Sequence, residues 1–157
     1  MEAVSNTTCL ILLAKLDRLG LLQNVFKKIL IPPEVKGELF AKVCPETIIL
    51  GKDIDTFIFG FSPKKIKSLP LDSGEQSAIS LCLENPSWHF LSDDKRARSF
   101  ARSLGIKTIG VIGVLLKNLS EGKVTKEEAK GILHELVRNG LYISTDLFTK
   151  VEELIEG

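Results

Sequence analysis

Five oxygen-bearing side chains lie after the short strand-like segments of this chain: Asn6 and the pair Asp93-Asp94 directly follow strands, Glu38 lies in the helix after the second strand, and Glu75 starts a later helix. In open parallel sheets, ligands bind beyond the carboxyl ends of the strands, so residues at these places are the first candidates for chemistry. Carboxylate and amide oxygens gathered at one edge would hold a hard divalent cation. The residue types and their spacing therefore predict a cation site.

Two of the carboxylates are harder to explain as ordinary surface residues. Apolar side chains follow Glu75 at three, four and seven residues, which places its carboxylate on the buried stripe of the predicted helix. A carboxylate there needs a partner or a metal. Glu38 lies three residues after Val35 and beside Leu39, on the expected inward face, whereas Glu34 could remain in solvent. We interpret Glu38 and Glu75 as functional.

Each member of the set also has a purely structural alternative. Asn6 could cap the helix that follows it. Asp93 and Asp94 could serve the dipole of the next helix. Asp72 and Glu75 have the spacing of a capping box. The functional interpretation therefore depends on the whole set.

A basic strip follows the last acidic pair. Lys95, Arg98 and Arg102 share one face of the predicted helix at helical spacing, opposite an apolar face. Cations beside an acidic pocket suit a phosphodiester backbone, with the metal at one phosphate and the cations at its neighbours. An ordinary solvated helix face is the alternative.

Other chemistries lack the residues they need. The two histidines, His89 and His134, fall in separate predicted elements, which argues against a zinc site or a histidine-based triad. No glycine-rich phosphate loop with the fingerprint spacing is present. Trp88 could stack on a base, but a packed residue at the start of a strand is the simpler interpretation.

The elements that must position these residues alternate between strand and helix, which predicts one α/β domain with a parallel sheet covered by helices on both faces. Strands are expected at residues 3–5, 29–31, 89–91 and 107–109, and β-type residues also occur at 47–50 and 56–61. Helices are expected at 7–16, 33–42, 74–84, 94–104, 111–119, 126–139 and 146–155. Residues 62–65 read as a loop.

Composition sets the remaining limits. The 157 residues, 44% of them hydrophobic, fit a single domain spanning residues 1–157. The 21 basic and 20 acidic residues nearly cancel, so any basic footprint must be local. Three widely spaced cysteines, Cys9, Cys44 and Cys82, suit reduced thiols and hence the cytoplasm. We expect neither a signal peptide nor a membrane span.

These segments together resemble the PIN-domain superfamily, in particular the prokaryotic branch related to VapC-type toxins. The similarity spans nearly the whole chain, in order, at residues 4–8, 10–22, 31–38, 71–79, 91–98, 104–106, 110–115 and 140–144. It implies a three-layer α/β/α sandwich with a central, mainly parallel sheet. It also implies an endoribonuclease that depends on Mg²⁺ or Mn²⁺.

The resemblance also implies roles for individual residues. Glu38, Glu75 and Asp94 would be catalytic, and the metal-binding set would be Asn6, Glu38, Glu75, Asp93 and Asp94, with Asp94 favoured over Asp93. Lys95, Arg98 and Arg102 would position the RNA. The VapC similarity further implies a small antitoxin protein as partner and a homodimer.

One departure from the family pattern concerns Asn6, which stands where such proteins usually carry Asp. An amide can coordinate a cation through its oxygen but adds no negative charge, which weakens metal binding and water activation. The main alternative is therefore a catalytically impaired PIN-like module that binds RNA or a protein partner. A receiver-like phosphotransfer domain is a further alternative, but Asn6 replaces the Asp that it would need.

Overall fold

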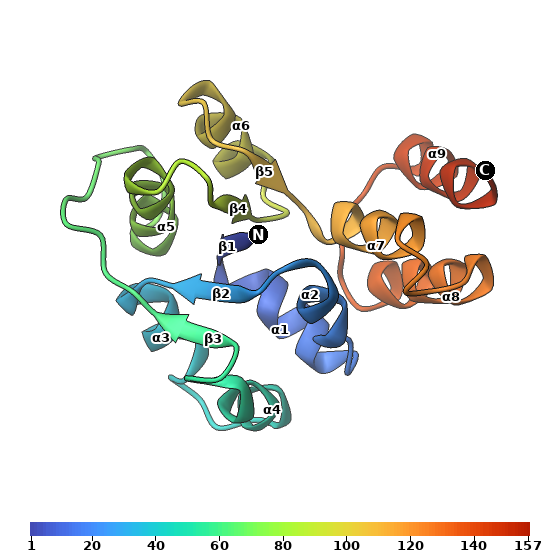
Figure 1. The fold of residues 1–157 in the computed structure, drawn as a ribbon, viewed down its shortest axis with the longest axis horizontal. Helices are drawn as coiled ribbons and strands as arrows, with labels where there is room; N and C mark the ends of the chain where they lie inside the picture. Colours follow the sequence, from blue (N-terminus) through green and yellow to red (C-terminus); the bar gives the residue numbers. More distant parts are fainter.

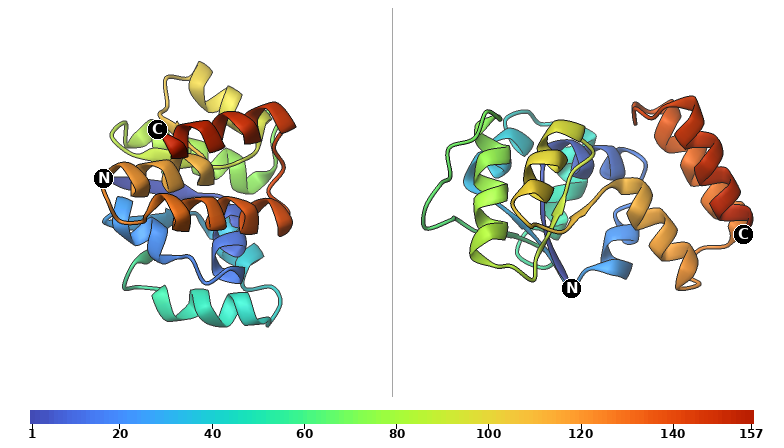
Figure 2. Two further views of the ribbon diagram at one scale, coloured as in Figure 1. Left: turned by 90° about the vertical axis from the view of Figure 1, so that its right-hand side faces the viewer. Right: turned by 90° about the horizontal axis from the view of Figure 1, so that it is seen from above.

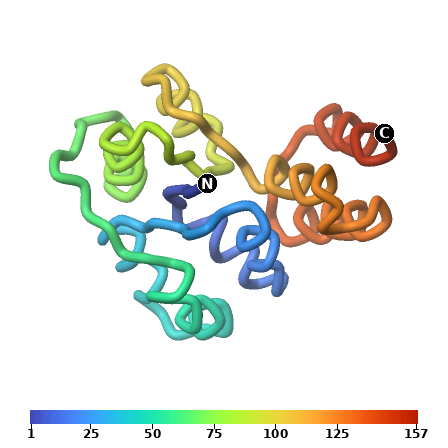
Figure 3. Tube along the Cα trace, viewed as in Figure 1, coloured from blue at the N-terminus to red at the C-terminus, as the bar shows by residue number.

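The computed structural model describes residues 1–157 and has a five-stranded, all-parallel sheet at its centre, with strand order β3-β2-β1-β4-β5 (Figure 1). The strands are β1 (Glu2–Ser5), β2 (Lys28–Ile31), β3 (Ile58–Gly60), β4 (His89–Leu91) and β5 (Thr108–Ile109). The N-terminal strand β1 lies in the middle, where Ala3 pairs with Ile29 on one side and with His89 on the other. The chain path shows this strand surrounded by later segments (Figure 3).

Nine helices surround the sheet: α1 (Thr7–Lys15), α2 (Gly20–Val25), α3 (Pro33–Leu39), α4 (Pro45–Asp53), α5 (Ser73–Glu84), α6 (Lys95–Ser103), α7 (Val111–Ser120), α8 (Lys126–Arg138) and α9 (Thr145–Glu156). Consecutive residues of a strand point to opposite faces, so each inner strand contributes to two apolar cores. Val4 and Leu30 pack with α5 and α6, whereas Ala3 and Ile29 pack into the larger core of the opposite face. These three layers confirm the predicted α/β sandwich.

The structure corrects the sequence prediction in the segment between β2 and β3. Residues 47–50, predicted as β-type, belong to helix α4. Pro45 occupies the first turn of that helix, and Thr47 closes a capping box with Cys44, so local capping outweighs the β-propensity of the isoleucines. Helix α3 ends at Leu39 rather than at residue 42, and the short helix α2 was not predicted.

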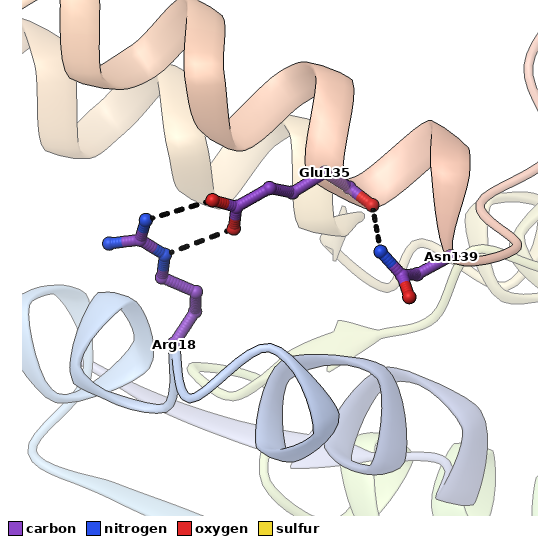
Figure 4. A network of polar contacts seen from close by, with 3 residues as sticks. All are labelled: Arg18, Glu135 and Asn139. Carbon is purple, nitrogen blue, oxygen red and sulfur yellow. Dashed lines mark hydrogen bonds and ion pairs between the residues drawn. The ribbon is translucent and has the colours of Figure 1, made fainter.

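The C-terminal helices α8 and α9 form a hairpin that packs on α7 at one end of the sheet (Figure 2). Helix α8 begins at Thr125, which forms the predicted capping box with Glu128. Arg18, just after α1, joins this hairpin to the body of the domain because its guanidinium donates to both oxygens of Glu135 at 3.4 and 3.2 Å (Figure 4). Asn139 in turn donates to the Glu135 carbonyl at 2.8 Å.

None of the helices combines the length and the apolar character that a membrane crossing requires.

Candidate metal and nucleic-acid site

An acidic cavity of about 130 Å³ opens beyond the carboxyl ends of β1 and β4. The residues that line it come from the starts of α1 and α5, from α3 and from the loop after β4: Asn6, Thr7, Thr8, Val35, Glu38, Asp72, Gly74, Glu75 and Asp94. We call it the acidic cavity. It brings together four of the five side chains predicted from the sequence and leaves out Asp93.

Asn6 is fixed at both ends of its amide. Its Nδ2 donates to Ser92 Oγ at 3.0 Å, and its Oδ1 accepts from the Cys9 N–H at 3.1 Å. The second bond makes Asn6 the N-cap of α1, which confirms the capping role, and the first ties the end of β1 to the loop after β4. The Asn6 amide therefore lines the cavity and also joins the two segments on which the cavity is built, the start of α1 and the loop after β4.

Glu38 is exposed and lines the solvent side of the acidic cavity. Thr7 Oγ1 donates to Glu38 Oε2 at 2.8 Å, a contact between α1 and α3. Gly74 makes room for the same carboxylate, because a Cβ at position 74 would stand 3.1 Å from Glu38 Oε1. Thr7 and Gly74 thus direct Glu38 toward the start of α5.

The prediction that Glu38 faces inward and Glu34 stays in solvent is wrong. Glu38 is exposed, whereas Glu34 is half-buried between α3 and α5. Glu34 Oε2 accepts from Ser77 Oγ at 2.6 Å, and its Oε1 is buried without a partner. The direction in which this seven-residue helix faces is set by packing against α5, which the spacing of a few apolar residues did not reveal.

Glu75 is the most perturbed carboxylate of the cavity. Partial burial, and then the negative charges of Asp72 and Asp94, raise its pKa from the ordinary 4.5 to about 7. Asp72 is the N-cap of α5 and accepts from the Glu75 N–H at 2.8 Å, so the helix start itself places these two carboxylates side by side. Like charges are crowded here, which favours an added cation.

The neighbours Asp94 and Asp93 have different surroundings. Asp94 lines the cavity and caps α6, since its Oδ1 accepts from the Ala97 N–H at 2.8 Å. Asp93 points away from the cavity, where it accepts from the Val111 N–H at 3.0 Å and from the Cys9 thiol at 3.3 Å. Burial, with the adjacent Asp93 charge, raises the pKa of that thiol well above its ordinary value. Asp93 therefore acts as a structural link between β4 and α7.

The basic strip is not a uniform solvent face. Lys95 and Arg102 are exposed, but Arg98 is half-buried and its Nε is buried without a partner. A Cβ at Gly110 would stand 2.9 Å from Arg98 Nη1 and 2.6 Å from Asp93 Oδ1, so a glycine is what allows the guanidinium to lie there. Arg98 thus occupies a tight place beside Asp93 and is less exposed than Lys95 and Arg102.

The donor set of the acidic cavity fits a hard divalent cation by its chemistry. Four carboxylates and one amide line the cavity, all oxygen donors of the kind that Mg²⁺ and Mn²⁺ prefer. No three His, Cys, Asp or Glu side chains of the chain form a ready-made metal cluster, so the carboxylates share a cavity without a closed ligand shell. The histidines lie in β4 and α8 and do not line it.

Sequence reasoning missed three polar residues that line the cavity, Asp72, Thr7 and Thr8. Asp72 was interpreted only as a cap. Its place three residues before Glu75 was a usable signal, because the side chains of a helix N-cap and of the residue three positions later lie close together. Thr7 and Thr8 carry no such signal, since threonines after an N-cap are ordinary in helices.

Comparisons with known proteins give two matches of different kinds. A family model described as a PIN domain, DUF3368, matches residues 2–156. A solved structure of a PilT N-terminus domain protein from the hyperthermophilic archaeon Sulfolobus solfataricus is similar in fold, with a TM-score of 0.57 and 22% sequence identity, and the alignment covers 76% of this chain and 94% of that one. No curated protein matches the chain.

Proposed function

From the premise that this chain belongs to the PIN-domain family, whose model matches residues 2–156, we propose that it is a divalent-metal-dependent endoribonuclease. PIN domains are generally metal-dependent nucleases. The metal, the RNA substrate and the site residues of this particular chain are the proposed part.

One observation carries the proposal: carboxylates from separate elements line the same cavity at the carboxyl edge of a parallel sheet. Glu38 comes from α3, Asp72 and Glu75 from the start of α5, and Asp94 from the start of α6. Without a cation, this arrangement raises the pKa of Glu75 to about 7. Mutual repulsion of crowded carboxylates destabilises the fold, and perturbed pKa values of this kind cluster at functional sites.

The proposed roles follow from the contacts of each residue. Glu38, Glu75 and Asp94 hold Mg²⁺ or Mn²⁺, directly or through water, and Asp72 adds negative charge beside them. A cation bound there would supply polarisation of the scissile phosphate and a lower pKa of the attacking water. Asn6, held at both ends, orients a water at the floor of the cavity.

The basic residues of α6 have separate parts in the proposal. Exposed Lys95 and Arg102 bind the RNA backbone beside the acidic cavity. Arg98, half-buried beside Gly110, contributes its positive charge.

The test is cleavage of a labelled single-stranded RNA by the purified protein with Mn²⁺, with Mg²⁺ and with chelator. Wild type, Asn6→Asp and Glu75→Gln are compared, with Glu127→Gln, an acid in the first turn of α8 far from the cavity, as the control. We expect metal-dependent cleavage by wild type and by the control, faster cleavage by Asn6→Asp and none by Glu75→Gln. Cleavage by Glu75→Gln at the wild-type rate would remove Glu75 from the catalytic set.

A catalytically impaired PIN module that binds RNA or a protein without cutting is the second candidate, and Asn6 favours it. Both ends of the Asn6 amide are engaged in structural bonds, and the residue adds no charge to the cavity. Cleavage by Asn6→Asp alone would support this candidate.

We also propose that the chain is a VapC-type toxin with a small antitoxin protein as its partner, that it forms a homodimer and that it lies in the cytoplasm. An antitoxin-like reading frame beside the gene and growth arrest on expression, relieved by Glu75→Gln, would support the toxin role. The mass of the purified protein in solution tests the homodimer.

A further inference from the structure

The segment between β3 and α5, residues 61–71, runs along the outside of α5 (Figure 1). Hydrogen bonds join it to α5 at regular intervals. Three side chains of α5 spaced four residues apart accept its backbone N–H groups. Glu84 accepts from Lys64 and Lys65 at 2.9 to 3.1 Å, Ser80 Oγ from Lys67 at 2.8 Å, and Gln76 Oε1 from Leu69 at 3.2 Å. Side chains four apart share one helix face, so α5 holds this segment as a fixed strap. We call it the basic strap.

The hydrogen bonds to α5 leave the charged side chains of the strap exposed to solvent. Because α5 binds the backbone, the side chains of Lys64, Lys65 and Lys67 are all exposed, and none of them forms an ion pair. Glu84 is the acidic residue that contacts the strap, and its oxygens accept backbone N–H groups there. The strap with Glu84 therefore has a formal charge of +2 on a protein whose total is +1.

Apolar surface is interleaved with these cations. Phe61 is 48% exposed, Ile66 51% and Leu83, on α5, 38%. The Phe61 ring is held edge-on against Trp88, with ring centroids 5.7 Å apart and an angle of 84° between the planes. A cavity of about 320 Å³ lies between strap and helix, lined by Lys65, Lys67, Ser80, Leu83 and Glu84. Free cations beside a fixed aromatic face and a shallow cavity are the combination that binds single strands.

The strap also leads to the acidic cavity. Its last residue, Leu71, accepts from Gln76 Nε2 at 2.9 Å, and the next residue, Asp72, lines the acidic cavity. A chain bound along the strap would thus reach the acidic cavity at Asp72.

We propose that the basic strap is a binding track for single-stranded RNA, in which Lys64, Lys65 and Lys67 contact successive phosphates and the exposed face of Phe61 stacks on a base. The inference rests on the proposed function for the identity of the nucleic acid. An acidic protein would use the cations but has no need of the aromatic face, so RNA is the occupant that uses both.

The test is binding of a fluorescein-labelled single-stranded RNA in EDTA, so that no cleavage occurs, followed by anisotropy over a range of salt concentrations. The strap variant is Lys64→Gln/Lys65→Gln/Lys67→Gln. Its matched control is Lys52→Gln/Lys123→Gln/Lys150→Gln, which removes the same charge from exposed lysines on other elements. Circular dichroism checks the fold of each variant. We expect the fold to be retained, because the strap donates backbone N–H groups to α5 and the substitutions do not remove these bonds.

We expect the strap variant to bind at least tenfold more weakly and to reduce the slope of log affinity against log salt by about 2, because each phosphate contact on a single strand contributes about 0.7. Phe61→Ala should weaken binding about tenfold without changing the slope. Equal losses in the strap and control variants, an unchanged slope, or no RNA binding by wild type would each overturn the track.

Failure of the track is distinguishable from failure of the nuclease. Strap-dependent binding without metal-dependent cleavage would support the track and refute the nuclease. Cleavage with binding that ignores the strap would do the reverse. Binding of duplex RNA as tight and as strap-dependent as that of the single strand would overturn the role of base stacking.

Discussion

Replacing Glu75 by Gln should stabilise the metal-free protein at pH 8 and have little effect near pH 5. Burial and the charges of Asp72 and Asp94 raise the pKa of Glu75 from 4.5 to about 7 in the folded state. The folded protein therefore binds this proton more tightly than the unfolded chain does. The stabilisation from the bound proton is fully present below pH 4.5 and is lost as the pH rises through 7. Gln is neutral throughout and avoids that loss.

The magnitude follows from the same values. A pKa raised from 4.5 to about 7 corresponds to an upper limit of ~3 kcal/mol against the ionised form above pH 7. Since Glu75 is only half-buried, solvent screening lowers this to roughly 1–2 kcal/mol. Removing an acid from the first turn of α5 costs about 0.3–1 kcal/mol of helix-dipole stabilisation in the opposite direction. Glu127→Gln in the first turn of α8 measures that cost separately.

The assay is urea unfolding of wild type, Glu75→Gln and Glu127→Gln in EDTA at pH 8 and pH 5. After the change in Glu127→Gln is subtracted, the free energy of unfolding of Glu75→Gln should exceed that of wild type by roughly 1–2 kcal/mol at pH 8 and by less than half of that at pH 5. If Glu75→Gln is no more stable than wild type at pH 8, the carboxylates do not repel one another as the structure implies. The reasoning for a cation site would then lose its electrostatic support.

Three further predictions concern the surroundings of the cavity. Gly110→Ala should destabilise the fold by about 1–3 kcal/mol in urea, because its Cβ would stand 2.6 Å from a carboxylate oxygen. Gly131→Ala, in the middle of α8 with nothing within 4 Å, should stabilise it by about 0.5–1 kcal/mol, and equal effects would contradict the packing argument. Thr7→Val removes the hydrogen bond to Glu38 and should weaken Mn²⁺ binding about tenfold by calorimetry, whereas unchanged affinity would rule out a positioning role. Native protein should react with a thiol reagent only at Cys44, since the other two thiols are buried; a second fast thiol would refute their placement.

Much of the site could be predicted because local rules position it. Asn6, Asp72 and Asp94 each precede a helix, and a polar N-cap there is readable from the sequence. Parallel strands then bring these helix starts to one edge of the sheet. The preference for Asp94 over Asp93 agrees with the cavity lining, although its role in a metal site stays a prediction.

The errors have a common cause in packing between distant segments. Glu34 rather than Glu38 is half-buried because α3 packs against α5, 43 residues away at the Ser77 contact. Arg98 is half-buried because Gly110, from the loop before α7, leaves room for it. Neither partner stands near its contact in the sequence, so no local pattern could reveal the pairing.

The sequence by itself determined the alternation of strands and helices, the helix caps and the chemical types of the donors, since these depend on propensities and periodicities within a few residues. Only the tertiary structure decided which carboxylates share a cavity, because the strand order β3-β2-β1-β4-β5 joins segments far apart in the chain. It also decided the pKa of Glu75 and the outward lysines of the strap. Charge interactions and burial depend on distances in space, which residue numbers do not record.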